Sequence, residues 1–77
     1  MAVLNGYDRG DFYIETIIAG DATRDEFTMY NLYVEGIEPH GSAVMSEDFD
    51  FVRREYESII AKGIEKYIEE YKAKNKR

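Results

Sequence analysis

The residues whose types and spacing could perform chemistry are few. His40 and Ser42 lie two residues apart in the segment PHGSAV, and His40 is the one histidine of the chain. This pair could serve as base and nucleophile, but no third group at a recognisable spacing would orient the imidazole. We therefore interpret His40 as a polar loop residue beside a Pro and Gly turn, and we predict that the protein is not an enzyme.

A second candidate for chemistry is the acidic run SEDFD, residues 46–50, which resembles the start of a calcium-binding loop. The positions that follow lack the central glycine and the distal glutamate of an EF-hand. Glu47 and Asp48 instead suit the positive end of a helix, which Ser46 could cap. The chain has no cysteine and its glycines are scattered, so we predict neither a metal nor a cofactor.

The tripeptide Arg9-Gly10-Asp11 could be read as an integrin-binding signal in an extracellular protein. The segment MAVLNGYDRGD, however, lacks the basic start and the apolar run of a signal peptide, and no stretch approaches the length of a membrane span. We therefore predict a cytoplasmic protein without a membrane partner. In that setting the tripeptide is interpreted as a turn that precedes a strand.

Charge divides the chain into two parts. Residues 1–51 carry eleven acidic against two basic side chains, a net charge of -9, and residues 52–77 carry eight basic against five acidic, a net charge of +3. The acidic front should repel nucleic acid and anionic membranes. The sequence therefore does not favour nucleic acid as a partner.

Two strands must position most of the apolar residues before the C-terminal part. The stretches at about 11–19 and 26–35 alternate aromatic or β-branched residues with others, and turn-forming residues separate them. AVLNGY and SAVM are candidates for short additional strands. We predict an α+β fold, a single domain over residues 1–77, in which a small antiparallel β-hairpin or three-stranded sheet packs on one long C-terminal helix.

Apolar residues recur at steps of three and four from Phe49 to Tyr71, which predicts a helix over about 47–73. Such a helix would be roughly 40 Å long, and a compact domain of this size is about 30 Å across. Its overhanging part would expose Ile64 and Ile68, so we predict a two-fold homodimer built on them, with Gly63 permitting close approach. A kink at Gly63 that turns these residues inward is the alternative.

The face of the hairpin that points away from the helix should remain apolar and aromatic. Solvated sheet faces normally carry polar residues, so this face is typical of a binding surface. The alternative is that an N-terminal segment with Val3, Leu4 and Tyr7 covers it. The predicted partner-binding residues are Tyr13, Ile17, Phe27, Met29 and Tyr33, with Glu15 and Glu35 at the rim.

Together these features predict a small acidic protein-binding module. In size and composition the whole chain resembles the small proteins with which phages and other mobile elements block host enzymes, although no diagnostic motif carries this resemblance. It implies an inhibitor of a larger host protein. The alternative function is a small-ligand-binding homodimer whose interface cavity is lined by tyrosines and by His40.

Overall fold

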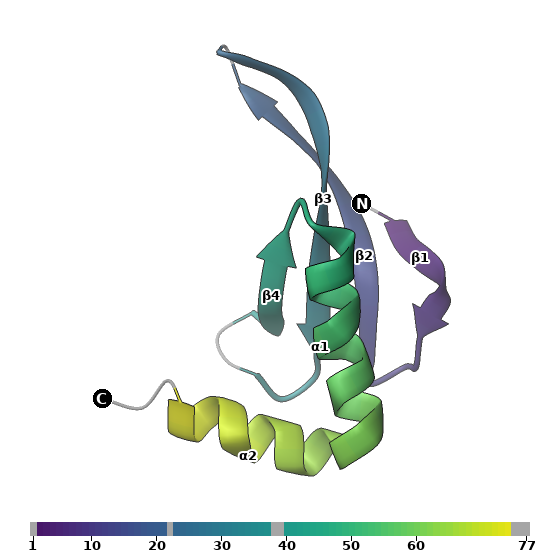
Figure 1. Cartoon of the computed structure of the whole chain (residues 1–77), viewed down its shortest axis with the longest axis vertical. Helices are drawn as coiled ribbons and strands as arrows, with labels where there is room; N and C mark the ends of the chain where they lie inside the picture. Colours follow the sequence, from purple (N-terminus) through teal and green to yellow (C-terminus); the bar gives the residue numbers. More distant parts are fainter. Residues whose placement is uncertain (1, 22, 38–39, 75–77) are drawn as a thin grey trace.

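The computed structural model describes residues 2–21, 23–37 and 40–74 (Figure 1). Within these residues the chain forms a four-stranded antiparallel sheet and two helices, so the predicted α+β class is confirmed. The sheet has more strands than the predicted two or three, because both short candidate segments are strands. The elements are β1 (Ala2–Asp8), β2 (Phe12–Asp21), β3 (Arg24–Val34), β4 (Ser42–Ser46), α1 (Phe49–Lys62) and α2 (Ile64–Lys74).

The strands lie in the sheet in the order in which they follow along the chain, β1-β2-β3-β4. The predicted hairpin is the centre of this sheet, and β2 and β3 pair in register from Phe12 opposite Val34 to Ala19 opposite Phe27. Successive side chains of a strand point to opposite faces. Phe12, Ile14 and their cross-strand neighbours therefore share one face, which is the face that α1 covers.

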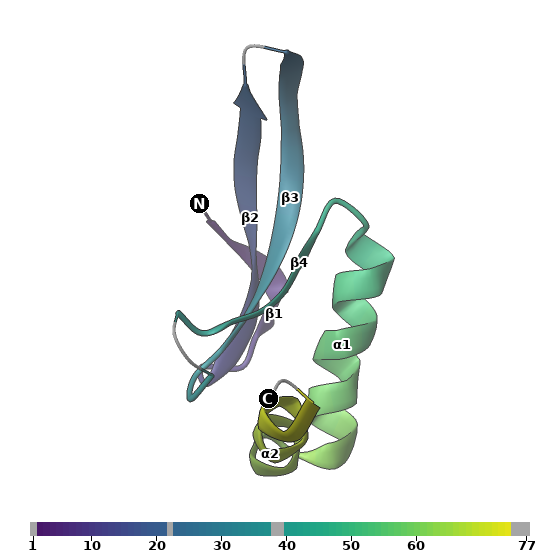
Figure 2. The ribbon, with the colours of Figure 1, turned by 90° about the vertical axis from the view of Figure 1, so that its left-hand side faces the viewer.

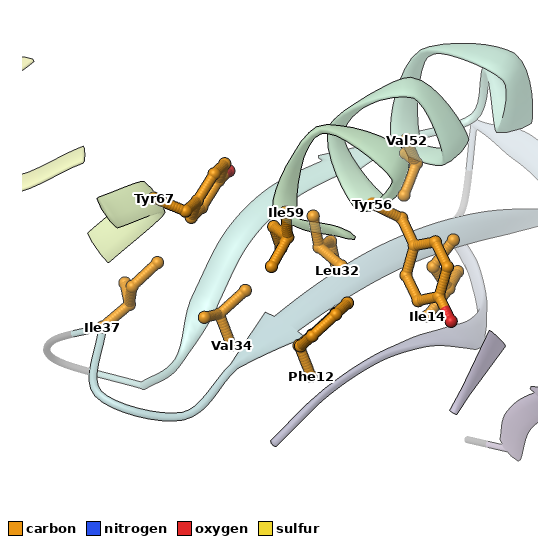
Figure 3. Close-up of a cluster of buried hydrophobic side chains, with 9 residues drawn as sticks. All are labelled: Phe12, Ile14, Leu32, Val34, Ile37, Val52, Tyr56, Ile59 and Tyr67. Carbon is orange, nitrogen blue, oxygen red and sulfur yellow. The ribbon is translucent and has the colours of Figure 1, made fainter. Parts of the chain in front are cut away.

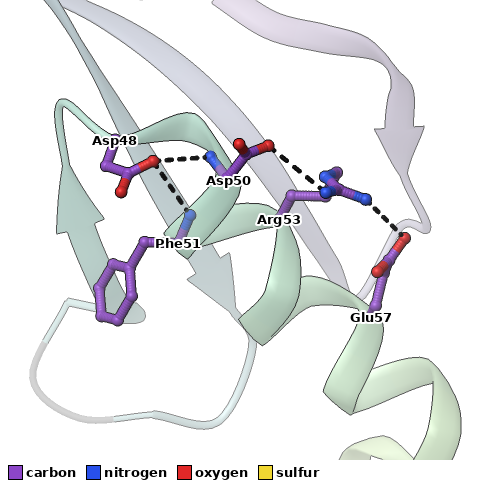
Figure 4. A network of polar contacts seen from close by, with 5 residues as sticks. All are labelled: Asp48, Asp50, Phe51, Arg53 and Glu57. Atoms are coloured by element: carbon purple, nitrogen blue, oxygen red, sulfur yellow. Dashed lines mark hydrogen bonds and ion pairs between the residues drawn. The ribbon is translucent and has the colours of Figure 1, made fainter.

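Helix α1 begins at the acidic run, where Asp48 rather than the predicted Ser46 is the N-cap residue (Figure 4). The Asp48 carboxylate accepts hydrogen bonds from the backbone N–H groups of Asp50 and Phe51, at 3.0 and 3.4 Å. Ser46 acts one step earlier, because its hydroxyl accepts the N–H of Asp48 at 3.0 Å. The run is thus a capping segment, and caps of this kind stabilise a helix by about 1 kcal/mol.

The prediction of one long helix over 47–73 is wrong, because the helix ends at Lys62 and a second one begins at Ile64. Gly63 lies between them with φ 92° and ψ 147°, a backbone conformation that residues with a Cβ rarely adopt. The periodic apolar pattern continues across Gly63, so periodicity alone could not reveal the break. The turn brings α2 across the end of α1 and beside the rest of the domain (Figures 1 and 2).

The core lies between α1, α2 and the inner face of the sheet (Figure 3). Tyr7 of β1 closes one side of it, with its ring 5.4 Å from that of Phe49 and 5.2 Å from that of Tyr56. Burying aliphatic and aromatic side chains of this size stabilises a fold by about 1.5–3 kcal/mol each. The buried apolar residues are Phe12, Ile14, Leu32, Val34, Ile37, Val52, Tyr56, Ile59 and Tyr67.

The β2–β3 hairpin is longer than the rest of the sheet and projects beyond it (Figures 1 and 2). On one side β1 pairs with β2 only as far as Ala2 opposite Thr16, and on the other side β4 pairs with β3 only as far as Ser46 opposite Tyr30. The segments 17–21 and 24–29 therefore pair only with each other within the described sheet. We call them the projecting hairpin.

Candidate binding surface

The sheet has one face that no described helix covers. Figure 2 shows α1 along one side of the sheet and no element along the other. We call this second side the outer face. Cross-strand pairing within the described sheet places twelve residues on it: Val3, Asp8, Tyr13, Glu15, Ile17, Ala19, Phe27, Met29, Asn31, Tyr33, Ser42 and Met45.

Two tyrosines form the first row of the outer face, at the base of the sheet. Tyr13 and Tyr33 are cross-strand neighbours, and their rings stack with centroids 4.9 Å apart and planes 18° apart. Below them lies Gly41, where a Cβ would overlap the ring of Tyr33. Gly41 is the reason why the Tyr33 ring can lie this close to the backbone, with both rings half-buried.

A chain of polar side chains forms the second row and crosses three strands. The Ser42 hydroxyl donates to Oδ1 of Asn31, and Nδ2 of Asn31 donates to Oε1 of Glu15 at 2.8 Å. Asn31 is only 5% exposed although no helix covers this face, so its amide needs these partners. These hydrogen bonds hold the Glu15 carboxylate beside the tyrosine pair.

The electrostatic environment of Tyr13 reflects this arrangement. Partial burial raises the pKa of Tyr13, and the nearby Glu15, Tyr33 and Asp8 raise it further. The hydroxyl is therefore protonated across the physiological range and can act as a hydrogen-bond donor to a bound group.

The third and fourth rows of the outer face are apolar and belong to the projecting hairpin. Ile17 pairs with Met29, and Ala19 pairs with Phe27. These four side chains are half-buried, whereas Ile18 on the opposite side of the hairpin is 62% exposed because α1 does not reach it. The outer face thus changes along the strands from a tyrosine pair, through a polar row, to two apolar rows.

The structure brings six of the seven predicted partner-binding residues onto this face: Tyr13, Glu15, Ile17, Phe27, Met29 and Tyr33. Glu35 follows the end of β3 and is exposed at the base of the sheet, where its backbone N–H donates to the carbonyl of Asp11 at 2.8 Å. Sequence reasoning did not predict that Asn31, Ser42 and Gly41 help to order this face. The period of two along β3 placed Asn31 on this face, but nothing in the sequence indicated its two hydrogen-bond partners.

The N-terminal segment does not cover the outer face, so that alternative is wrong. Residues 2–8 form the edge strand β1 beside β2. Leu4 and Tyr7 pack against the core on the helix side. Val3 lies on the outer face, opposite Glu15, and is 47% exposed.

The residues predicted to form a dimer interface lie against the core of their own chain. Ile64 and Ile68 are half-buried and pack on the buried cluster, with Cδ1 of Ile68 close to Gly36. The premise of that interface, a helix that overhangs the domain, is therefore wrong. The kink at Gly63, stated above as the alternative, is what the structure shows.

The angle between α1 and α2 holds a small polar groove of about 100 Å³. On one wall the Tyr67 hydroxyl donates to Oε1 of Glu55 at 3.1 Å, and burial followed by the charge of Glu55 raises the pKa of Tyr67 strongly. On the other wall Nζ of Lys62 lies 2.6 Å from Oε1 of Glu70 and lowers the pKa of that carboxyl. Pockets for small ligands are several times larger, so we interpret this groove as the joint between the helices.

The structure also shows where the remaining candidates for chemistry lie. His40 is exposed in the turn before β4, and the Ser42 hydroxyl is engaged by Asn31. Residues 9–11 form the turn between β1 and β2, in which the Gly10 N–H donates to Asp8 at 2.9 Å. Among the described residues, no group of three or more His, Asp or Glu side chains is arranged to hold a metal ion. No described helix is long and apolar enough to cross a membrane.

Comparison of the chain with protein-family models, with curated proteins and with solved structures finds no match.

Proposed function

We propose that the protein is a non-enzymatic binding module that docks a larger protein on the outer face of its sheet. The observation that carries this proposal is an uncovered sheet face on which a stacked tyrosine pair, a fixed carboxylate and two apolar rows adjoin one another. Interface centres are enriched in tyrosine and methionine and have polar rims. The outer face has this composition.

The geometry also limits the entropic cost of binding. Tyr13 and Tyr33 hold each other in place, and Gly41 fixes the position of the Tyr33 ring, so little side-chain freedom is lost when a partner covers them. The Asn31 amide likewise holds Glu15 before any partner arrives. A surface that is ordered in advance suits a small inhibitor. We propose that the partner is a host enzyme or other host protein, of the kind that phages and mobile elements block.

The proposal is tested with the purified protein as bait in a lysate of its own cells, followed by identification of the captured protein and titration of the two purified components. We expect Tyr33→Asp to weaken binding at least tenfold, about 1.4 kcal/mol, because a charge would lie at the centre of the interface. Ile60→Asp is the matched control, since Ile60 is 46% exposed on α1. It should bind as the wild type does.

Met29→Asp provides a second variant, because Met29 lies in the projecting hairpin and away from the tightly packed Gly41. Circular dichroism and thermal unfolding verify that each variant folds. Full binding by both folded outer-face variants would contradict the proposal. Capture of a small molecule instead of a protein, seen by native mass spectrometry, would favour the alternative function of a ligand-binding homodimer.

A further inference from the structure

The two edges of the sheet differ in how they are protected from pairing with another strand. Natural proteins protect edge strands with charges, prolines or bulges. Both edge strands shift register against their neighbours, β1 between Val3 and Asp8 and β4 opposite Leu32 and Tyr33, but only β1 also carries a charge, because it ends in an aspartate. The sequence of β4 is SAVMS, with no charge and no proline. Within the part of the chain that the structure describes, β4 pairs on one side only, with β3, which leaves its other edge for a further strand.

Apolar side chains border the β4 edge on both faces of the sheet. On the outer face Met45 is 48% exposed, and on the inner face Val44 is half-buried. The side chain of Phe51, in the first turn of α1, points to the side of β4 and is 47% exposed (Figure 4). A strand added beside β4 would cover parts of all three side chains and satisfy the backbone groups of the edge.

We propose that this added strand is β4 of a second copy of the chain, paired antiparallel about a two-fold axis near Val44. In that register Ser42 of each copy faces Ser46 of the other, and the pairing is self-complementary, as a two-fold interface requires. The acidic residues beyond the strand do not meet each other. Glu47 lies opposite Gly41 of the second copy, and Asp48 lies opposite its His40.

Charge favours the same antiparallel arrangement. The projecting hairpin and the start of α1 lie toward one end of the molecule and α2 lies at the other (Figure 1). Among the residues whose side chains the structure describes, 25–26 and 47–50 carry five acidic and no basic side chains, and 62–74 carry four basic against three acidic. A two-fold axis normal to the sheet turns the acidic end of each copy toward the basic end of the other.

The dimer interface differs from the residues Gly63, Ile64 and Ile68 that the sequence suggested. It leaves the outer face open, because a strand added at an edge extends a sheet without covering it. The two outer faces would join into one surface over eight strands. A five-residue strand buries little area, so the association should be weak and should depend on concentration.

Sedimentation equilibrium tests the proposal at concentrations from about 10 µM to about 1 mM, where small interfaces associate. The wild type should rise from the 9.0 kDa of one chain toward twice that mass. Met45→Lys should stay at the mass of one chain, because it places two ammonium groups near the axis. Val3→Lys is the matched control on the other edge strand, 47% exposed against 48%, and should associate as the wild type does.

Cross-linking gives a second readout that does not depend on a charged variant folding. The chain has no cysteine, so Met45→Cys and Val3→Cys each introduce a single thiol. A short bismaleimide should link two copies of the Met45 variant and should leave the Val3 variant as single chains. A wild type of one-chain mass at every concentration would overturn the proposal, as would preferential linking through Val3.

Discussion

At the scale of single residues, Gly41 determines how the tyrosine pair lies on the outer face. Its φ is 78°, and a Cβ at this position would overlap the Tyr33 ring, which in turn stacks on Tyr13. Gly41 therefore has two separate reasons to be glycine. One is the backbone conformation and the other is space.

Comparison of Gly41→Ala with Gly10→Ala separates these two reasons. Gly10 has a similar φ of 85°, but no atom lies within 4 Å of its would-be Cβ, so Gly10→Ala should cost only the backbone term of about 1–2 kcal/mol. Gly41→Ala should lower the free energy of unfolding further, because the Tyr33 ring must move. Urea unfolding measures the difference, and the ring proton shifts of Tyr33 should change only in Gly41→Ala. Equal losses would show that the ring is not tightly packed.

Tyr67 makes the stability of the fold depend on alkaline pH. Because burial and Glu55 raise its pKa in the folded state above the ordinary value of about 10, the folded protein keeps this proton more tightly than the unfolded chain does. The contribution of the protonated Tyr67 hydroxyl to the free energy of unfolding is complete below about pH 10 and is lost as the pH rises above that value.

We expect Tyr67→Phe to cost about 1 kcal/mol at neutral pH, from the lost hydrogen bond to Glu55, and to flatten the fall in stability above about pH 10. Tyr13→Phe is the comparison, because the pKa of Tyr13 is also raised but its ring lies on the uncovered face. Thermal unfolding between pH 8 and about 11 measures both. An unchanged alkaline slope in Tyr67→Phe would show that another group dominates.

At the scale of elements, Gly63 decides whether the C-terminal part of the chain is one helix or two. The second helix brings the ring of Tyr67 into the core and Ile68 against Gly36. A straight helix would remove these contacts. The break in the helix at Gly63 thus allows Tyr67 and Ile68 to pack against the rest of the domain.

Gly63→Ala should lower the free energy of unfolding by about 1–3 kcal/mol, because only glycine adopts φ 92° and ψ 147° without strain. Either the strained kink persists, or the helix straightens and Tyr67 loses its cover. Far-UV circular dichroism distinguishes these results, since straightening raises the helical signal. A gain in stability would contradict the role assigned to Gly63.

The strands and the kink at Gly63 show which features could be predicted from the sequence and which could not. Alternation along β2 and β3 gave their faces correctly, because a period of two is a local property. The β1 and β4 strands are short and could be indicated only as candidates. The kink depends on what α2 gains by packing against Ile37 and the core, and this is a tertiary effect that no local pattern contains. The hydrogen bonds of Asn31 join side chains from three strands, and they were missed for the same reason.

At the scale of the whole molecule, the acidic charge and the outer face would act on the proposed partner in separate ways. The net charge is -6, and acidic side chains such as Asp8 and Glu35 are exposed around the tyrosine pair. Charges at an exposed rim act mainly on the rate of association, and buried aromatic contacts act mainly on affinity.

The association rate with the captured partner should therefore fall between low and high salt while the dissociation rate changes little, so the affinity should fall only in proportion to the association rate. Surface plasmon resonance at two ionic strengths measures both quantities. A steep loss of affinity with salt would show that charge leads the binding, as expected if the acidic front occupied a basic groove of a nucleic-acid enzyme. In that case the effect of Tyr33→Asp should also be small.

The order of the strands has a consequence for how the chain acquires its structure during synthesis. Each strand pairs with the next one along the chain, so the sheet can assemble hairpin by hairpin as it leaves the ribosome. The helices come last, and a contact such as that between Arg9 Nε and the Tyr56 hydroxyl, 3.3 Å apart, joins residues 47 positions apart. Until residues 49–74 emerge, Phe12, Ile14, Leu32 and Val34 have no cover. The nascent sheet is then most exposed to aggregation and to chaperones, and docking of the helices ends that period.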